Sequence, residues 1–404
     1  MSGIRRLSGE ARLALVLLTV ALLMSVSRTS AMIGSITHDL DLSATKLGLV
    51  LGAGGLAALT VVGVAFVVDR RGPHPIMPMG ALIAAAGMLL LSIAAGFWSL
   101  AAASAVIGLG TAAVSAPILY AVAAKGCRRY RGTVIGGIAF LTTVPTASVS
   151  REIAEVFGWR WTAAAFSGLT VVAAIGLFVL LPRVFPVRSR SSGPAPAWQP
   201  DRDEDGQSWR QLRQTPGFWK VLGVVALVFA FGQALRTTGD FSGFWLLRDS
   251  SSSLDMGELL SWSRLATALG ALLWGIASDV VPARRLIPAA SAMVMASIVS
   301  FSFLEGSTAG LLGMQLLGLG LGLGAAVSLP WVLLADHVGI RYFATLGLGV
   351  SSVGRLISFP VPLAAGYALD GWGATGAGAL LAAFALALAL ASFRAPRLAK
   401  VSVR

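Results

Sequence analysis

Long apolar runs separated by short polar segments make up most of this sequence. A helix needs about 20 apolar residues to cross the roughly 30 Å hydrocarbon core of a bilayer, and twelve stretches approach that length. The polar segment 183–217, rich in Pro and Ser, is typical of a linker. The pattern predicts an all-α membrane protein with six-helix units at residues 1–182 and 218–404. The predicted spans are 13–36, 46–68, 75–96, 99–123, 132–151, 161–182, 218–242, 256–278, 286–304, 308–334, 343–368 and 374–393.

One device appears in each half of the chain: an acid that closes an apolar run and is followed by arginines. Its first copy lies in the stretch 63–75 and its second in the stretch 275–285. A small residue, Ala65 or Gly275, stands four positions before the acid. Two copies at matching places indicate a doubled membrane unit. The charged or special residues of the device are Asp69, Arg70 and Gly72 in the first copy and Asp279, Arg284 and Arg285 in the second.

Further echoes support this repeat. The sequence AVSAP at 113–117 returns as AVSLP at 326–330, and Thr133 returns as Thr345, at offsets of 213 and 212 residues. Because each half holds six spans, both halves begin on the same side of the membrane. The repeats are therefore predicted to be parallel and related by an axis along the membrane normal.

Composition and charge agree with a membrane protein and set its orientation. The chain is 56% hydrophobic and only 12% charged, against roughly 25% charged residues in soluble domains. Of its 31 Lys and Arg residues, 23 fall in the segments on the N-terminal side of the membrane. The positive-inside rule then predicts an inner (plasma) membrane protein with both termini cytoplasmic and the first span retained. The dispersal of the basic residues argues against nucleic-acid binding.

Four arginines lie inside predicted spans, where a charge costs roughly 2.5–3.5 kcal/mol and is a functional hypothesis by default. Arginine binds carboxylate or phosphate with two parallel hydrogen bonds and stays protonated. One acid, Asp240, lies a helical turn after one of them, so the zone carries excess positive charge. That balance favours an anionic substrate. The four arginines are Arg28, Arg236, Arg264 and Arg355.

Each of these arginines also has a structural explanation. Arg28 and Arg236 lie in the outer part of their spans and can extend to the headgroups, and Arg236 can pair with Asp240 at i, i+4. Arg264 lies near the midplane, where a hydrogen bond to a carbonyl of another helix would satisfy it. Arg355 is intermediate in depth.

The chain resembles the major facilitator superfamily over essentially its whole length. The resemblance rests on the repeated device and on the phrase FGWRWTAAAF at 157–166; the first copy departs from the usual motif at Ala65 and at Pro73 and His74. It implies two six-helix bundles around a central cavity and alternating access by rocking. In that fold the helices that hold the four arginines face the cavity. The pair in the first and seventh spans looks like that of organophosphate:phosphate antiporters, and the pair in the eighth and eleventh like that of oxalate/formate and monocarboxylate carriers.

The repeated device predicts a gate at the cytoplasmic surface. Acid and base pairs there can close in one conformation and open in another, which biases a two-state equilibrium. In the alternative interpretation the arginines only set topology and the acids are their solvated partners. Under both interpretations the device selects no substrate.

We therefore expect a monomeric secondary transporter, in the lipid bilayer, that moves a small organic anion with a proton or a counter-anion as coupling partner. The alternatives are a proton-driven drug or sugar exporter and a transporter-like receptor that binds without transport. No acid, base and nucleophile meet at one depth, so an enzyme is not expected. The sequence contains no recognisable cofactor motif or metal-ligand cluster, and the single Cys127 leaves no partner for an intramolecular disulfide.

Overall fold

The computed structural model describes residues 32–40, 73–114, 116–127, 130–143, 156–184, 216–248, 256–303, 312–338, 343–358 and 360–394, together with isolated positions elsewhere. Within this part of the chain every regular element is a helix. Four described helical stretches are long and apolar enough to cross a membrane, and shorter apolar helices accompany them. The four are Phe97–Ala124, Trp159–Val179, Gly217–Arg236 and Met314–Asp336.

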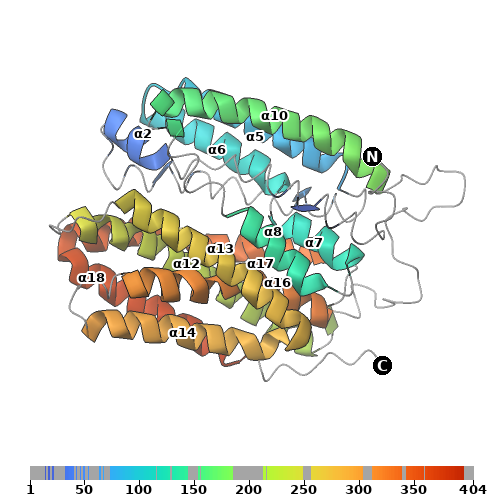
Figure 1. The fold of residues 1–404 in the computed structure, drawn as a ribbon, viewed down its shortest axis with the longest axis vertical. Coiled ribbons are helices and arrows are strands. Elements are labelled where there is room, and N and C mark those ends of the chain that lie inside the picture. The colour runs from blue at the N-terminus through green and yellow to red at the C-terminus, as the bar shows by residue number, and fades with distance from the viewer. Residues whose placement is uncertain are drawn as a thin grey trace, which may run out of the picture.

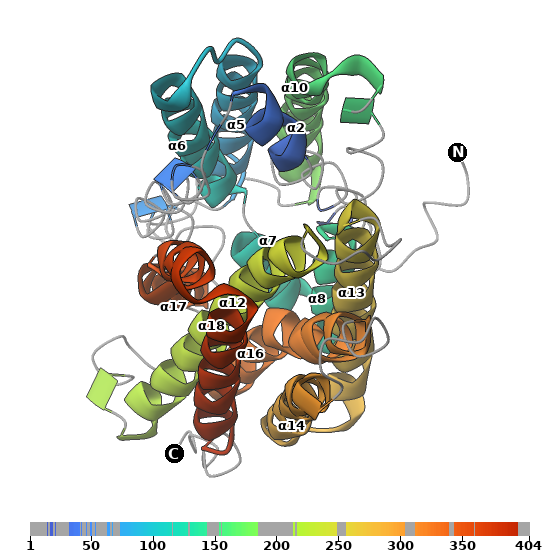
Figure 2. The same cartoon turned by 90° about the vertical axis from the view of Figure 1, so that its left-hand side faces the viewer.

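The helices form two layers with their axes roughly parallel (Figure 1). One layer comes from the first half of the chain, and the other from the second half. Two short helices of the first half, α7 and α8, lie between the layers, as the view along the helices also shows (Figure 2). The first layer contains α2 (Ile33–Asp39), α5 (Ile76–Ser92), α6 (Phe97–Ala113) and α10 (Trp159–Val184), and the intervening helices are α7 (Ala116–Gly126) and α8 (Arg131–Leu141). The second layer contains α12 (Pro216–Arg248), α13 (Met256–Val280), α14 (Ala283–Phe303), η5 (Met314–Gly322), α16 (Leu323–Val338), α17 (Phe343–Ser358) and α18 (Val361–Ser392).

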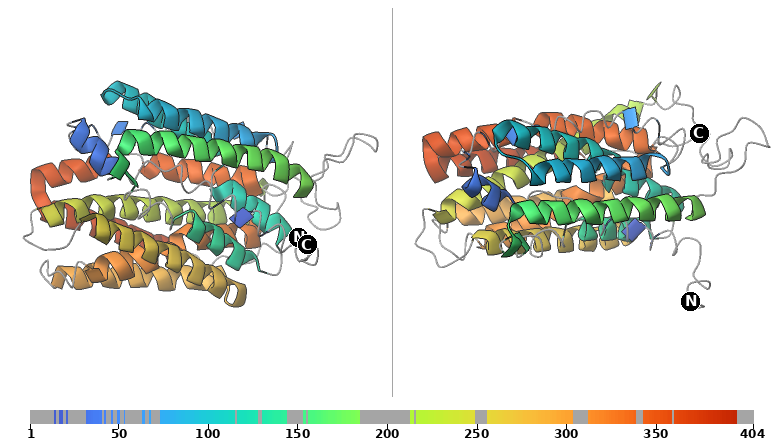
Figure 3. Two further views of the ribbon diagram at one scale, coloured as in Figure 1. Left: turned by 45° about the horizontal axis from the view of Figure 1, so that its top comes forward. Right: turned by 90° about the horizontal axis from the view of Figure 1, so that it is seen from above.

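Helices α5, α6 and α10 run side by side in the first layer (Figure 3). The Ser167 hydroxyl of α10 donates a 2.8 Å hydrogen bond to the Ala85 carbonyl of α5. At one end of this layer, Asp39 accepts hydrogen bonds from Trp159 Nε1 at 2.9 Å and from the Arg160 guanidinium at 3.0 Å. We call Asp39, Trp159 and Arg160 the outer brace. It lies in the predicted outer loops and joins α2 to the start of α10.

In the second layer, helix α13 is held to the tenth span by three side chains. Ser263, Thr267 and Trp274 donate to main-chain carbonyls of residues 315, 319 and 321. These carbonyls belong to η5, a π-helical segment that occupies residues 314–322 of the predicted span 308–334. A π-helix disturbs the regular backbone hydrogen bonding of an α-helix and is frequent at functional sites. Polar side chains that bond across helices in this way stabilise membrane bundles.

The boundary between the last two predicted spans is wrong. Helix α17 ends at Ser358 and α18 begins at Val361, so the break lies at Pro360, inside the predicted span 343–368. Helix α18 then continues through the Gly-rich segment 369–373, which separates the two predicted spans. Proline has no backbone N–H and clashes with the preceding turn, so it interrupts the helix, whereas glycine lowers helix propensity without preventing a helix.

Candidate substrate site and inner contact

The N-terminus of α8 meets the C-terminal end of α13 at the predicted cytoplasmic end of the bundle. The Asp279 carboxylate accepts hydrogen bonds from the backbone N–H of Gly132 at 2.7 Å, the backbone N–H of Thr133 at 2.9 Å and the Thr133 hydroxyl at 2.6 Å. The first N–H groups of a helix have no partner within the helix, and the N-cap Tyr130 makes no side-chain capping bond. Asp279 therefore caps a helix that belongs to the other half of the chain, where the helix dipole also favours a negative charge.

Three glycines let the two helices approach at backbone distance. A methyl group added to Gly136 would lie 2.7 Å from the Ala271 carbonyl oxygen, and one added to Gly275 would lie 2.5 Å from the Gly132 carbonyl oxygen. Both distances are shorter than side chains tolerate, so the contact requires glycine. We call Gly132, Thr133, Gly136, Gly275 and Asp279 the inner contact. The small residue of the repeated device thus serves the close approach of α8 to α13.

Two further contacts join the halves near the inner contact. Arg131 at the start of α8 pairs with Asp336 near the end of α16, at 3.4 Å. The ring of Tyr120 on α7 lies 5.5 Å from the ring of Trp331 on α16, and both side chains are buried. Tyr120 and Trp331 thus fill the space between the halves.

A small polar hollow lies between α12, α13 and α16. It is lined by Gln233 and Arg236 from α12 and by Thr267 from α13, and its remaining wall is apolar or small. Arg236 is partly buried. The free space admits a group about the size of one water molecule, so the helices are closely packed here in this conformation. We call this space the polar hollow; its other lining residues are Gly232, Leu323, Ala326 and Val327.

Arg264 lies on α13, one turn before Thr267, and is partly buried. Its neighbour Ser263 is 5% exposed and its hydroxyl donates to the main-chain oxygen of Gln315 at 3.1 Å, while the Gln315 side chain is 1% exposed. Arg264 therefore adjoins a buried polar group between α13 and η5. Arg264 precedes Thr267, which lines the polar hollow, by one turn of α13.

The other predicted substrate residues are placed only in part. Asp240 lies on α12 one turn after Arg236. Arg355 lies on α17 next to Gly354, which packs on the Phe229 ring. The side chains of Asp240 and Arg355 are outside the described part of the structure. Arg28 lies wholly outside the described residues.

The first copy of the repeated device is also largely outside the described residues, which exclude Asp69, Arg70 and Gly72. The residues that follow it, from Pro73 onward, are described. Among them, burial lowers the pKa of the His74 imidazole below its ordinary value of 6.5. In the second copy, Arg284 is partly buried and Arg285 is exposed, both in the first turn of α14.

Sequence reasoning did not single out several residues that shape these contacts. Gln233 and Gln315 interrupt apolar runs, which is a signal for a buried polar role. Arg131 belongs to a basic segment between two predicted spans, where an arginine indicates topology alone. Asp336 gave no signal, because an acid that follows a span looks like an ordinary solvated residue.

These observations define a multi-pass membrane protein whose halves meet at a backbone-tight contact beside an arginine-lined hollow. Residues 13–345 match the family model described as Major Facilitator Superfamily. The chain therefore belongs to the major facilitator superfamily, whose members are transporters and not enzymes.

Two comparisons with individual proteins add detail. A protein of Mycolicibacterium smegmatis (strain ATCC 700084 / mc(2)155) named "MFS-type efflux pump" is 31% identical over 257 residues, which cover 60% of this chain and 56% of the relative. The match thus spans about half the length of that relative. The crystal structure of the human organic anion transporter MFSD10 (TETRAN) superposes with a TM-score of 0.69 at 15% identity, covering 96% of this chain and 100% of that chain. This second likeness shows a common fold.

Proposed function

We propose that the protein is a secondary active transporter that moves a small organic anion across the inner membrane by alternating access. The observation that carries the proposal is the polar hollow, in which Arg236 shares one space with Gln233 and Thr267. A guanidinium supplies a permanent positive charge and a planar pair of donors, and the amide and hydroxyl supply further hydrogen bonds. Such a set suits a carboxylate, a phosphate or a phosphonate.

In this proposal the two halves, residues 1–182 and 218–404, rock about the site, with both termini cytoplasmic. Arg264 approaches the anion from α13, Arg28 and Arg355 approach it from the first and eleventh spans, and Asp240 neutralises Arg236 when the site is empty. Protonation of Asp240 would couple transport to a proton; exchange for a counter-anion is the other coupling.

The inner contact would serve as the cytoplasmic gate. Asp279 and its glycine neighbours hold α8 on α13 in this conformation, and in this proposal that contact is the closed state of the gate. Opening it exchanges the bonds of Asp279 for water, and arginines 284 and 285 then lie beside the freed carboxylate. By the repeat, we assign the equivalent role in the gate to Asp69, Arg70 and Gly72, which lie outside the described residues.

A binding and flux measurement tests this function. Purified protein is screened by thermal shift against carboxylates, phosphates and phosphonates, because a ligand that binds the folded state raises the melting temperature. The best ligand is then followed in proteoliposomes, where accumulation separates a transporter from a receptor. We expect Arg236→Gln and Arg264→Ala each to weaken anion binding by roughly 30-fold or more, because each leaves a buried anion without its counter-charge.

Two controls sharpen this test. Arg394→Gln changes an exposed arginine after the end of α18 that does not line the hollow, and should leave anion affinity unchanged. Arg236→Lys keeps the charge but loses the planar donor pair, so its loss should be intermediate. Normal transport by both Arg236→Gln and Arg264→Ala would disprove the site assignment.

A second function, proton-driven drug export, has one observation in its favour: the printed name of the M. smegmatis relative, an efflux pump. It predicts that neutral or cationic drugs are moved against a proton gradient and that Arg236→Gln leaves this movement intact. Efflux of a cationic dye from vesicles with an imposed pH gradient distinguishes this function from anion transport.

A further inference from the structure

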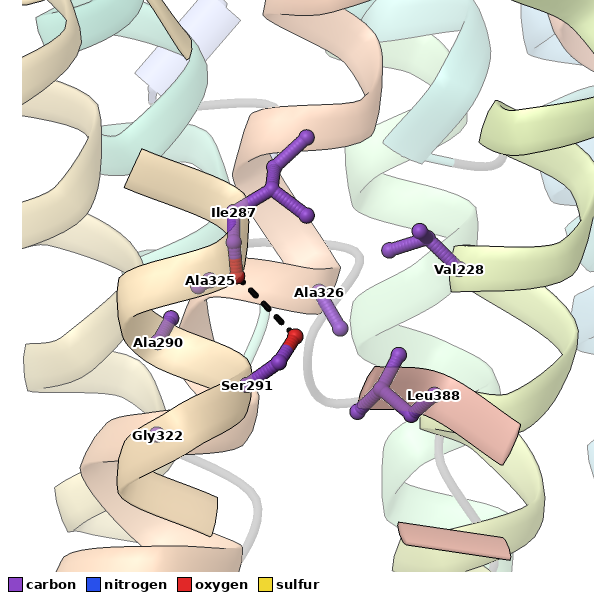
Figure 4. A pocket seen from close by; sticks show the side chains of 8 residues that line it. All are labelled: Val228, Ile287, Ala290, Ser291, Gly322, Ala325, Ala326 and Leu388. Carbon is purple, nitrogen blue, oxygen red and sulfur yellow. Dashed lines mark hydrogen bonds between the residues drawn. The ribbon is translucent and has the colours of Figure 1, made fainter. Parts of the chain in front are cut away.

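A second hollow lies within the last helices, and it is almost entirely apolar. Its walls are Val228 of α12, Ile287 and Ala290 of α14, Ala325 and Ala326 of α16 and Leu388 of α18 (Figure 4). The one hydroxyl in the wall, that of Ser291, donates a 2.9 Å hydrogen bond to the Ile287 carbonyl of its own helix. The hollow therefore offers a guest hydrocarbon surface alone. We call it the apolar hollow.

The apolar hollow and the polar hollow adjoin each other. Ala326 lines both of them, and α12 contributes Val228 to the first and Gly232, one turn later, to the second. Between them α12 touches α16 through Gly232 and Ala326: a methyl group added to Gly232 would lie 2.7 Å from the Ala326 Cβ. At this contact between the cationic and the apolar space, which we call the partition, neither Gly232 nor Ala326 has a side chain larger than a methyl group.

Burial identifies this partition as the side from which the apolar hollow is approached. Val228, Ala290 and Leu388 are each 2% exposed, so the far walls are sealed by protein. Ala326, which faces both hollows, is only partly buried. A group that enters the apolar hollow therefore passes from the polar hollow between α12 and α16, when these helices separate by a small amount.

We infer that the transported anion has a short apolar end, which occupies the apolar hollow while its charged end is bound at Arg236. This inference rests on the proposed function and names the substrate class for the same site. Along α12, Arg236, Gly232 and Val228 follow one another at steps of about 6 Å. An anion with its head at Arg236 and its tail past Gly232 needs a chain of roughly four to six carbon atoms, at about 1.5 Å per bond.

The tail is short because the space is small. In this closed conformation the apolar hollow admits a group about the size of one methyl group or water molecule. Removal of a methylene from such a contact, or addition of one too many, changes discrimination by roughly 10- to 200-fold in apolar substrate pockets. The walls of the apolar hollow would therefore set the preferred chain length, and Arg236 the preferred charge.

The test measures chain-length preference rather than total affinity. Acetate, butyrate, hexanoate and octanoate are titrated against the purified full-length protein by thermal shift and then used as competitors in proteoliposome exchange. The matched neutral amides, butyramide and hexanamide, report the contribution of charge. We expect the wild-type protein to prefer butyrate or hexanoate over acetate, and to bind the amides at least about tenfold more weakly.

Filling and enlarging the hollow should move this preference in opposite directions. Ala290→Val places two further carbons in the hollow and should weaken hexanoate about tenfold while acetate is unchanged. Leu388→Ala should improve octanoate relative to butyrate about tenfold. Each variant has a matched control on an exposed face of the same helix, Ala289→Val on α14 and Leu386→Ala on α18.

The outcomes separate the two proposals. If Arg236→Gln removes binding of every carboxylate but Ala290→Val and Leu388→Ala leave the chain-length profile of the wild type, the apolar hollow is only a packing defect and this inference is wrong. If no carboxylate binds the wild type, this inference is wrong, whereas binding of a phosphate or phosphonate would still support the proposed anion site. If Arg236→Gln has no effect on the binding of any anion, the proposed anion site fails and the inference fails with it. Melting temperatures without ligand show whether the variants are folded. If Ala290→Val overpacks the core and fails to fold, Leu388→Ala still tests the inference, because it removes side-chain volume.

Discussion

The outer brace and the inner contact are built from the same chemistry but join different parts of the molecule. In each, an aspartate at a helix end accepts hydrogen bonds from the beginning of another helix: Asp39 from Trp159 and Arg160, and Asp279 from Gly132 and Thr133. The partners of Asp39 lie in the same layer, whereas those of Asp279 lie in the other half of the chain. A carboxylate at a helix end therefore holds one body together in the first case and two bodies in the second.

This difference predicts opposite consequences for the two aspartates. Loss of the outer brace weakens a unit that stays assembled during transport. Loss of the inner contact changes the balance between two conformations, because its bonds exist in one of them and are absent from the other. The predictions below are arranged from the largest expected effect to the smallest.

Asp279→Ala should produce the largest effect. It removes the acceptor of three hydrogen bonds to the start of α8. Hydrogen bonds to charged groups contribute about 1.5–3 kcal/mol each when buried, and this site is partly exposed, so we expect the closed state to lose roughly 30-fold in relative population. The measurement is the rate at which an impermeant thiol reagent modifies Val327→Cys, in a Cys127→Ala background, from the cytoplasmic side.

The matched control is Asp39→Asn in the same background, which should leave the modification rate as it was. A rate that rises equally in both variants would show that the two aspartates act through general stability. A rate unchanged by Asp279→Ala would remove the inner contact from the gate.

Sequence alone predicted the long helices and the doubled device, because the length of an apolar run and an acid followed by arginines can be read directly from the order of residues. It placed Asp279 at the end of its helix, as the structure does, but named no partner for it. The partners are mainly backbone N–H groups, which every residue except proline possesses and which leave no trace in a sequence. The echo of Thr133 by Thr345 indicates the repeat, but it does not identify Asp279 as the partner of Thr133.

The candidate site was predictable to a similar extent. Arg236 stood out because a charge in an apolar run is costly. Gln233 and Thr267 line the same hollow, but which faces of α12 and α13 meet depends on how each helix is rotated, and helical periodicity is weak in spans that are apolar all round. The π-helical segment η5 and the interruption at Pro360 likewise depend on local backbone geometry.

The Arg131–Asp336 pair should give a smaller effect than Asp279. Its two side chains are 19% and 43% exposed, and exposed pairs contribute about 0.2–1 kcal/mol, which corresponds to a change of up to roughly fivefold in the closed population. Arg131→Asp should raise the cytoplasmic modification rate of the cysteine at position 327, because like charges would then face each other across the halves.

The exchanged pair, Arg131→Asp with Asp336→Arg, isolates the interaction. If the contact acts through its charges, the double variant should regain most of the wild-type rate. A double variant that is as open as, or more open than, Arg131→Asp would show that Arg131 acts by packing against α16.

The smallest effect belongs to the pH dependence of the outer brace. The hydrogen bond from Trp159, together with the hydrogen bond and charge of Arg160, holds the pKa of Asp39 below its ordinary value of 3.8. A carboxyl with a lowered folded-state pKa stabilises the fold at pH values above its unfolded pKa, and this contribution is lost as the pH falls through the lower, folded value.

The wild-type protein should therefore melt at a slightly higher temperature than Asp39→Asn at pH 7 and at pH 5, with the same difference at both. The difference should shrink below about pH 4, because the wild-type carboxyl then takes up its proton and resembles the amide. Melting temperatures of the two proteins in detergent at pH 7, 5 and 3.5, with Asp279→Asn measured in parallel, would check this; a difference that grows toward acid pH would contradict the assigned role of Asp39.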